Sequence, residues 1–320
     1  MAARTWRTCR RRWRWAGAWR SSCATAAPVL PATQPDAAEP SAVRVIVTRP
    51  LAEAERWVQG LAQQGIEALA VPLIEIRPLA QTGAIAAAWR RCRQCQAIMF
   101  VSAAAVAHFF AARPPDADLG TPEQGPRLWA PGPGTVAALV RQGVDPRRID
   151  APAVGSGQYD SEALWAQVGA RVQPHWQVML VRGAARDVSL PAPNASTQRD
   201  PSPAAGDAQG EGRDWLARQL VQAGAQLHWV VAYWRAAPRP QAVRQALAQH
   251  GVGDDDLWLF TSSQAIGNLR ACMPGHDWSR ARAIASHARI VAAAREAGFG
   301  EVQESRPALA DVAASIKSAQ

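Results

Sequence analysis

The stretch VRVIVTRPLAEAERWVQGLAQQGIEALAVPLIEIRP, residues 43–78, decides the fold class. It opens with a continuous apolar run, which is typical of a strand buried on both faces of a parallel sheet. A helical pattern follows Pro50, because the missing N–H of a proline is tolerated in the first turn of a helix. Gly65 then allows a left-handed exit from the helix, and a second apolar strand continues through Pro72. This strand–helix–strand order predicts an α/β protein.

The second half of the chain repeats this order. Residues 177–238 run from the apolar strand VMLV through an amphipathic helix to the strand LHWVVAYWR. AIMFVSAAAVAHFF (97–110) resembles LWLFTSSQAIGNLR (257–270), and residues 127–143 and 280–298 form a weaker pair. Repeated βα units predict two similar Rossmann- or flavodoxin-like parallel-sheet lobes joined by a two-stranded linker. The active site is then expected in the cleft between the lobes.

The first strand–helix–strand unit is too small to fold alone, so it must complete its sheet with later units. We therefore predict a discontinuous lobe formed by residues 43–77 and 239–320, with an inserted lobe formed by residues 81–234. Residues 78–80 and 235–238 would link the two lobes. Each crossover between parallel strands should be right-handed.

Two segments depart from the α/β pattern. Residues 187–213 are rich in Pro, Ala, Ser, Asp and Gly and are predicted to be a mobile loop within the second lobe. Residues 1–42 carry seven arginines but only Asp36 and Glu39 as acids, so +5 of the net charge of +9 lies there. We predict a disordered basic extension. A membrane-surface or nucleic-acid-binding arm is the alternative, because Arg and Trp suit both interfaces.

Composition narrows the class of protein further. No apolar run approaches the roughly 18–20 residues that cross a bilayer, so we expect no membrane association. The five cysteines form no evident disulfide framework, which predicts a reducing, cytoplasmic location. Cys92 and Cys95 have the spacing of a redox or half-zinc motif, but they precede a strand and no second pair completes a metal site. We favour a chance spacing and expect no cofactor or metal.

Small, hydroxylated and basic residues recur where the predicted strands end. Ligands of open parallel sheets bind at the carboxyl ends of the strands, where helix N-termini present their N–H groups. Each such residue alone is more often a plain helix cap, whereas several in two lobes favour an anionic ligand. The candidates are Thr48, Arg49, Ser102, Gly132, Thr135, Arg182, Gly183, Thr261, Ser262, Ser263, Ser286 and His287.

Familiar catalytic motifs are missing from the sequence. PGPGT (131–135) lacks the Lys of a phosphate-binding loop, and no GxSxG elbow supports a Ser-His-Asp triad. Tyr233 is the acid/base candidate, because it ends a strand beside the linker and a phenol can give a proton to a departing hydroxyl. A tyrosine simply packed at a strand end is the alternative. His108 and His228 are expected at surface or structurally satisfied positions.

Taken together, these segments resemble the uroporphyrinogen-III synthase family. The similar pieces are VIVTRP, PLIEIRP, IMFVSAAAV, PGPGTVAAL, SEAL, VMLVRG, VVAYWR, LFTSSQAIGNL and ASHARIVAAAREAGF, in the order of the family and spanning residue 43 to the C-terminus. The resemblance implies closure of the linear tetrapyrrole hydroxymethylbilane with loss of water and inversion of ring D. It also implies that Tyr233 assists departure of the hydroxyl group.

The resemblance carries further expectations about partners. The implied substrate bears eight carboxylates, which backbone N–H groups, hydroxyls and arginines would hold. We expect a monomer without nucleic-acid or membrane partners, which receives its substrate by transient handover from hydroxymethylbilane synthase. The alternative from another class is a non-catalytic, two-lobed binding protein for an organic polyanion.

Overall fold

The structure is a computed structural model, and it describes residues 43–153, 160–186, 188–189 and 211–318. The predicted disordered extension at 1–42 and most of the predicted loop at 187–213 lie outside these ranges. In the described part of the chain, no helix has both the length and the apolar character needed to cross a membrane.

The first sheet contains strands from both ends of the chain. Its order is β2-β1-β9-β10-β11, and every neighbouring pair is parallel. Val45 pairs with Leu257, 212 positions later in the sequence, so the end of the chain completes the sheet that its beginning opens. The strands are β1 (Val45–Val47), β2 (Ala68–Ala70), β9 (Leu257–Phe260), β10 (Arg282–Ala285) and β11 (Glu301–Glu304).

The second sheet is formed by the middle of the chain and is mixed. Its order is β3-β8-β7-β4-β5-β6, in which β3 runs antiparallel to β8 and the other pairs are parallel. The strands are β3 (Glu75–Pro78), β4 (Ala97–Phe100), β5 (Arg127–Trp129), β6 (Ile149–Asp150), β7 (Gln177–Ala184) and β8 (Gln226–Ala236).

The two sheets share one strand arrangement, which confirms the predicted repetition. Reading β8-β7-β4-β5-β6 beside β2-β1-β9-β10-β11 makes β7 equivalent to β1, β4 to β9 and β5 to β10. These are the strands whose sequences resemble each other. Each sheet therefore joins the opening βαβ unit of one half of the chain to the later strands of the other half.

Ten α-helices accompany these strands in the described residues. They are α1 (Leu51–Ala62), α2 (Gly83–Arg91), α3 (Ala103–Ala111), α4 (Pro133–Arg141), α5 (Ser161–Val168), α6 (Glu211–Gln222), α7 (Pro240–Gln249), α8 (Ser263–Cys272), α9 (Ala288–Glu296) and α10 (Leu309–Ser318). Short 3₁₀ turns are η1 (Cys92–Gln94), η2 (Pro146–Arg148) and η3 (Gly169–Arg171). Gly65, with φ of +75°, follows the end of α1 as predicted.

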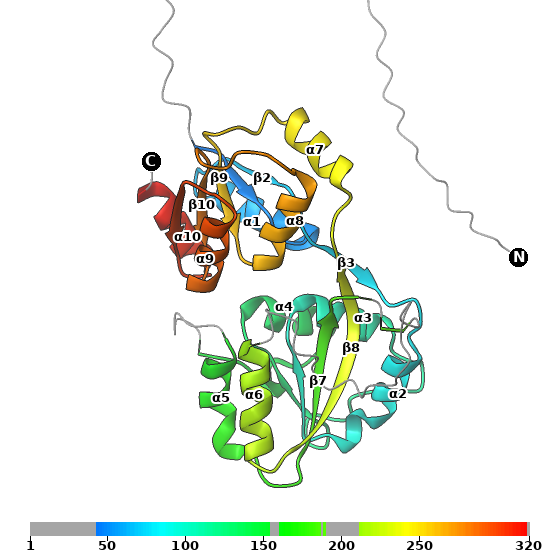
Figure 1. Cartoon of the computed structure of the whole chain (residues 1–320). Coiled ribbons are helices and arrows are strands. Elements are labelled where there is room, and N and C mark those ends of the chain that lie inside the picture. The colour runs from blue at the N-terminus through cyan, green and yellow to red at the C-terminus, as the bar shows by residue number, and fades with distance from the viewer. Residues whose placement is uncertain (1–42, 154–159, 187, 190–210, 319–320) are drawn as a thin grey trace, which may run out of the picture. The chain divides into compact units, whose positions relative to one another are not determined.

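Helices cover both faces of each sheet, because the side chains of a strand alternate between its faces. In the second sheet, Ile98 and Phe100 of β4 pack with α2, α3 and α4, while Met99 packs with α5 and α6. Figure 1 shows α5 and α6 on one side of β7 and β8, with α2 and α3 on the other. In the first sheet, Ile46 packs with α7, α8 and α9, and Val47 with α1 and α10.

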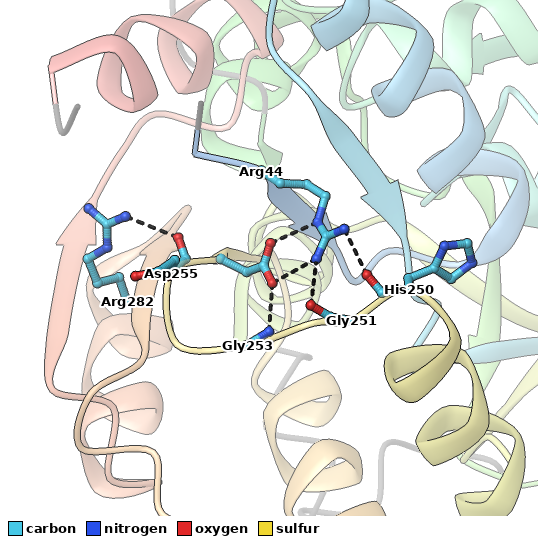
Figure 2. Close-up of polar contacts among 7 residues, drawn as sticks. Arg44, His250, Gly251, Gly253, Asp255 and Arg282 are labelled. Atoms are coloured by element: carbon cyan, nitrogen blue, oxygen red, sulfur yellow. Dashed lines mark hydrogen bonds and ion pairs between the residues drawn. The ribbon is translucent and has the colours of Figure 1, made fainter. Parts of the chain in front are cut away.

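An arginine fastens the start of the first sheet to a distant loop. Arg44 donates from Nε and Nη2 to the two carboxylate oxygens of Asp256, at 2.8 and 2.9 Å. It also donates to the carbonyl oxygens of His250 and Gly251, at 2.9 and 3.2 Å. Figure 2 shows this side chain reaching into the loop between α7 and β9, where the N–H of Gly253 also donates to Asp256.

Two sequence-based boundaries differ from the structure. Residues 211–213 were predicted to be loop, but α6 begins at Glu211. The run after Gly65 was predicted to continue as a strand through Pro72 into a connecting segment, whereas the structure has two separate strands there, β2 and β3, which belong to different sheets. β3 pairs with residues 233–236 at the end of β8, so these two strands connect the sheets, and the connection includes residues 75–77 as well as the predicted 78–80.

Candidate active site

A cavity of about 1010 Å³ is lined by elements of both sheets. Most of its lining is apolar, and comes from α1, the segment after β2, β3, α3 and α7. Its charged or titratable residues are Glu53 and Arg56 of α1, Glu75 of β3, His108 of α3 and Arg141 of α4. We call this space the large cavity.

A smaller cavity of about 550 Å³ adjoins the first and is more polar in character. The two cavities share Glu53, Arg56 and Ala103. The starts of α3, α4 and α10 line the smaller space, together with Arg49 and Trp57. Helix N-termini present unpaired N–H groups, so three of them beside two arginines suit an anion. We call this space the small cavity.

Arg49 is held in place from two sides. Its Nη1 donates to Glu53 Oε2 at 3.2 Å, and its guanidinium lies 4.3 Å from the ring centroid of Trp57. Its buried Nε has no hydrogen-bond partner among the described residues. Burial lowers the pKa of Arg49, with partial compensation from Glu53, but a guanidinium stays protonated in proteins. Arg49 is therefore an oriented cation whose Nε–H has no acceptor among the described residues.

Tyr233 lies behind these cavities. Tyr233 is 4% exposed, and its hydroxyl lies 3.2 Å from Ser102 Oγ, which also accepts from the N–H of Ala105. Ser102 is a residue of the small cavity wall. Gly183 is paired with Tyr233 across β7 and β8, and a Cβ there would lie 2.4 Å from Tyr233 Cζ. The absence of a side chain at Gly183 thus makes room for the phenol ring.

The structure brings four of the predicted binding residues together. Arg49, Ser102, Gly132 and Thr135 all line the small cavity. Gly132 and Ser102 are the N-cap residues of α4 and α3. Thr48 lies next to Arg49 in the chain, but it is buried and its hydroxyl donates to the carbonyl oxygen of Leu259 at 2.7 Å. Thr48 therefore joins β1 to β9.

The remaining predicted binding residues line neither cavity, as far as the described residues define the two walls. These are Arg182, Gly183, Thr261, Ser262, Ser263, Ser286 and His287. Ser262 caps α8 by accepting from the N–H of Gln264, and His287 caps α9 by accepting from the N–H of Arg289. The guanidinium of Arg182 lies 4.9 Å from the ring centroid of Trp229.

Several charged and aromatic residues of the cavity walls were not found from the sequence. Arg56, Trp57 and Arg141 went unnoticed, although Arg49, Glu53 and Arg56 follow the spacing of one helix face. His108 was expected at a surface or satisfied position, but it is half-buried in the wall of the large cavity. His228 does have a partner, because its Nε2 is hydrogen-bonded to Gln177 Oε1.

The cysteine pair lies away from both cavities. Cys92 and Cys95 are buried free thiols around η1, and burial raises the pKa of Cys92 to about 12 and that of Cys95 to about 11. A thiol reacts as its thiolate, so these two side chains are poor nucleophiles at neutral pH.

The two sheets define an α/β protein, and the small cavity lies at strand and helix ends, where open parallel sheets generally bind their ligands. The family model of uroporphyrinogen-III synthase HemD matches residues 55–193. The matched segment belongs to the uroporphyrinogen-III synthase family, which confirms the resemblance seen in the sequence.

Two solved structures are similar to this chain. One is a mutant uroporphyrinogen III synthase from the extremely thermophilic bacterium Thermus thermophilus, with 17% identity and a TM-score of 0.47, covering 87% of this chain and 98% of that one. The other is uroporphyrinogen-III synthetase from Helicobacter pylori, with 12% identity and a TM-score of 0.48, covering 87% of this chain and all of that one. No curated protein sequence matched the chain.

Proposed function

We propose that this chain is a uroporphyrinogen-III synthase, which closes hydroxymethylbilane to uroporphyrinogen III with loss of water and inversion of ring D. The family match over residues 55–193 carries the proposal. That segment supplies most of the small cavity and the α3 and α4 walls of the large one, including Arg56, Ser102 and His108. The family match gives no support to a non-catalytic polyanion-binding protein.

The two cavities suit different parts of such a substrate. The large cavity, with its apolar walls from α3 and α7, suits pyrrole rings, whereas the small cavity suits carboxylate side chains. Arg49 and Arg56 would pair with carboxylates, since charge-assisted hydrogen bonds are the strong ones. Holding both ends of a linear tetrapyrrole in one place favours ring closure by proximity.

Tyr233 assists the loss of the hydroxyl group in this proposal, and it acts through Ser102. The phenol is buried, but its hydrogen-bond partner Ser102 is a residue of the small cavity wall. Ser102 would pass a proton to the departing hydroxyl, which leaves as water, while Tyr233 replaces the proton on Ser102. The terminal ring that carried the hydroxymethyl group is left as a cation, and the substituted carbon of ring D bonds to it first, which gives a spiro intermediate. The bond from that carbon to its original methylene then breaks, and the freed cationic methylene bonds to the unsubstituted carbon of ring D. That carbon finally loses a proton, which returns to Tyr233 and restores neutrality.

The wider assignments follow from the same proposal. We propose that the two sheets are the cores of two lobes connected by β3 and the end of β8, and that the cavities are the cleft between these lobes. A cytoplasmic monomer would receive its unstable substrate directly from hydroxymethylbilane synthase.

Product analysis tests the proposed function. The protein is incubated with freshly generated hydroxymethylbilane, and the cyclised products are oxidised and resolved into isomers I and III. We expect isomer III to predominate with the native protein and isomer I with a heat-denatured sample, because uncontrolled closure gives the symmetric isomer. Isomer I alone from the native protein would contradict the proposal, and tight substrate binding in that case would favour the polyanion-binding protein.

A further inference from the structure

His108 connects the large cavity to Tyr233. Its ring is stacked on that of Tyr233, with centroids 5.7 Å apart and planes at 27°. His108 lines the large cavity, whereas Tyr233 lines neither of the two cavities, as judged from their described walls. The phenol therefore meets the large cavity through an imidazole and the small cavity through the hydroxyl of Ser102.

In the described wall around this imidazole, the carboxylates are paired with arginines and the other charged residues are cations. Glu53 pairs with Arg49, and Glu75 pairs with Arg77 at 2.5 Å. Arg56 of α1 and Arg141 of α4 are the cations in the described wall, and Tyr233 of β8 is the titratable group in contact with the ring. The lining contributed by α7 is apolar. Protonation of His108 would thus add a positive charge to a cavity that already contains two arginines.

We propose that His108 is a positioning residue for Tyr233 and that its imidazole must be uncharged during the reaction. This inference rests on the proposed function, in which the terminal ring that bears the hydroxymethyl group becomes a cation as its hydroxyl leaves as water. A neutral imidazole packs on the phenol and keeps it beside Ser102 without opposing that cation. An imidazolium at the same place would oppose it, because like charges in a partly buried site repel strongly.

The environment of His108 favours the neutral form. Burial lowers the pKa of His108 from its ordinary value, since desolvation penalises the charged imidazolium. The ordinary value for histidine is about 6.5, so the ring is largely neutral at physiological pH and gains its proton only in acid. The reaction should then lose rate in acid as His108 becomes charged.

Three variants of the full-length protein separate charge from packing. Turnover to isomer III is measured from pH 5 to 9 for the native protein, His108→Gln and His108→Arg, with His250→Gln as the matched control on an exposed histidine. The native protein should show an acid limb below pH ~6.5 that His108→Gln lacks. At neutral pH, the kcat of His108→Gln should fall less than that of His108→Arg, because glutamine loses the stacking on the phenol but adds no charge. His108→Arg should lower kcat roughly tenfold or more at every pH, because its charge is permanent.

The division between kcat and KM makes the test specific. A permanent cation should bind the anionic substrate at least as well as the native residue, so KM should stay unchanged or fall while kcat falls. Thermal unfolding and circular dichroism of each variant report folding separately. NMR titration of the histidine ring protons, assigned by comparison with His108→Gln, should place the pKa of His108 below the ordinary value for histidine.

The outcomes are distinct. An acid limb that persists unchanged in His108→Gln, or a native kcat in folded His108→Arg, would overturn this inference while leaving isomer III production intact. Failure of the native protein to form isomer III would instead contradict the proposed function.

Discussion

The hydroxyl of Tyr233 and its contact with Ser102 define the first residue-scale prediction. Tyr233→Phe keeps the ring beside Gly183 and in its stack with His108 but removes the donor. We expect kcat to fall by about ten- to a hundredfold, which is at or below the smallest rate enhancement usually provided by a positioned general acid. The thermal unfolding midpoint should not change. Stopped assays of isomer III formation measure the rate, and a native rate would remove Tyr233 from the mechanism.

Gly183 provides the second residue-scale prediction. In Gly183→Ala, the new methyl group would lie 2.4 Å from Tyr233 Cζ and 2.9 Å from its hydroxyl oxygen, so the phenol must move away from Ser102. We expect a drop in kcat comparable to that of Tyr233→Phe, together with about 1–3 kcal/mol of destabilisation from overpacking.

Gly267→Ala is the matched control for this substitution. Gly267 lies within α8, and a Cβ there has open space. The control should leave turnover unchanged and increase stability by roughly 0.5–1 kcal/mol, since alanine is the better helix former. Equal rates for the native protein and folded Gly183→Ala would show that the position of Tyr233 does not matter.

The sequence predicted some residues of the candidate site correctly, included others that lie elsewhere and missed His108. Ser102 and Gly132 were found because a residue that follows a buried strand and begins a helix has a defined place. Ser262 and His287 satisfied the same rule, yet the structure shows them as helix caps outside the cavity walls. His108 was missed because it sits on the second turn of α3, where no rule distinguishes a cavity-facing position from a solvent-facing one.

At the scale of elements, Asp150 joins an edge strand to its neighbours. Its carboxylate, 11% exposed, accepts from Arg127 Nε and Nη2 at 3.0 and 2.7 Å and from Trp129 Nε1 at 3.1 Å, and it pairs with Arg171 at 2.9 Å. β6 contains only two residues, so these contacts with β5 and η3 secure it. Asp150→Asn should cost about 1–3 kcal/mol of unfolding free energy in urea at neutral pH.

The pH dependence of this contribution has a defined sign. Burial alone would raise the pKa of Asp150, but the hydrogen bonds from Arg127 and Arg171 outweigh it, and the pKa lies below its ordinary value. A depressed carboxyl pKa stabilises the fold above about pH 4, the ordinary value, and the stabilisation is lost as the pH falls through the folded-state pKa.

The cost of Asp150→Asn should therefore shrink below about pH 4, as followed by urea denaturation across the acid range. Asp118→Asn is the control, because Asp118 is paired with Arg93 but exposed, and it should cost much less. A cost for Asp150→Asn that does not vary with pH would show that the ion pairs add no stability.

Most elements could be predicted from the sequence because their periodicity is strong. β4 and β9 are fully buried apolar runs, and β10 is buried after Arg282, which is the pattern expected of strands in a covered parallel sheet. The start of α6 was placed too late, because Glu211, Gly212 and Arg213 have the composition of a loop. The division between β2 and β3 could not be seen, since a proline in an apolar run does not say which sheet receives each half.

At the scale of the whole molecule, the halves of the chain exchange their opening βαβ units. β1 and β2 complete a sheet with β9, β10 and β11, while β7 and β8 complete one with β4, β5 and β6. Each sheet therefore depends on pairing between segments that are far apart in the sequence, and loop closure makes such pairing entropically costly. Contacts that hold β1 close to the distant strand β9 should therefore contribute more to the unfolding free energy than their small number suggests.

Arg44 and Asp256 provide such a contact, and substitution of Asp256 tests how much this ion pair contributes to the stability of the fold. Asp256 is 8% exposed and binds both the Arg44 guanidinium and the N–H of Gly253, so Asp256→Asn leaves a cation without its counter-ion (Figure 2). We expect a loss of about 2 kcal/mol in urea unfolding and a lower thermal midpoint. Asp254→Asn is the matched control, because the Asp254–Arg280 pair joins exposed side chains and should contribute little.

The substitution should affect stability and not activity. Since neither Arg44 nor Asp256 lines the described wall of either cavity, folded Asp256→Asn should retain native turnover at low temperature. Equal stability of the two variants would show that β1 is held by sheet pairing and core packing alone.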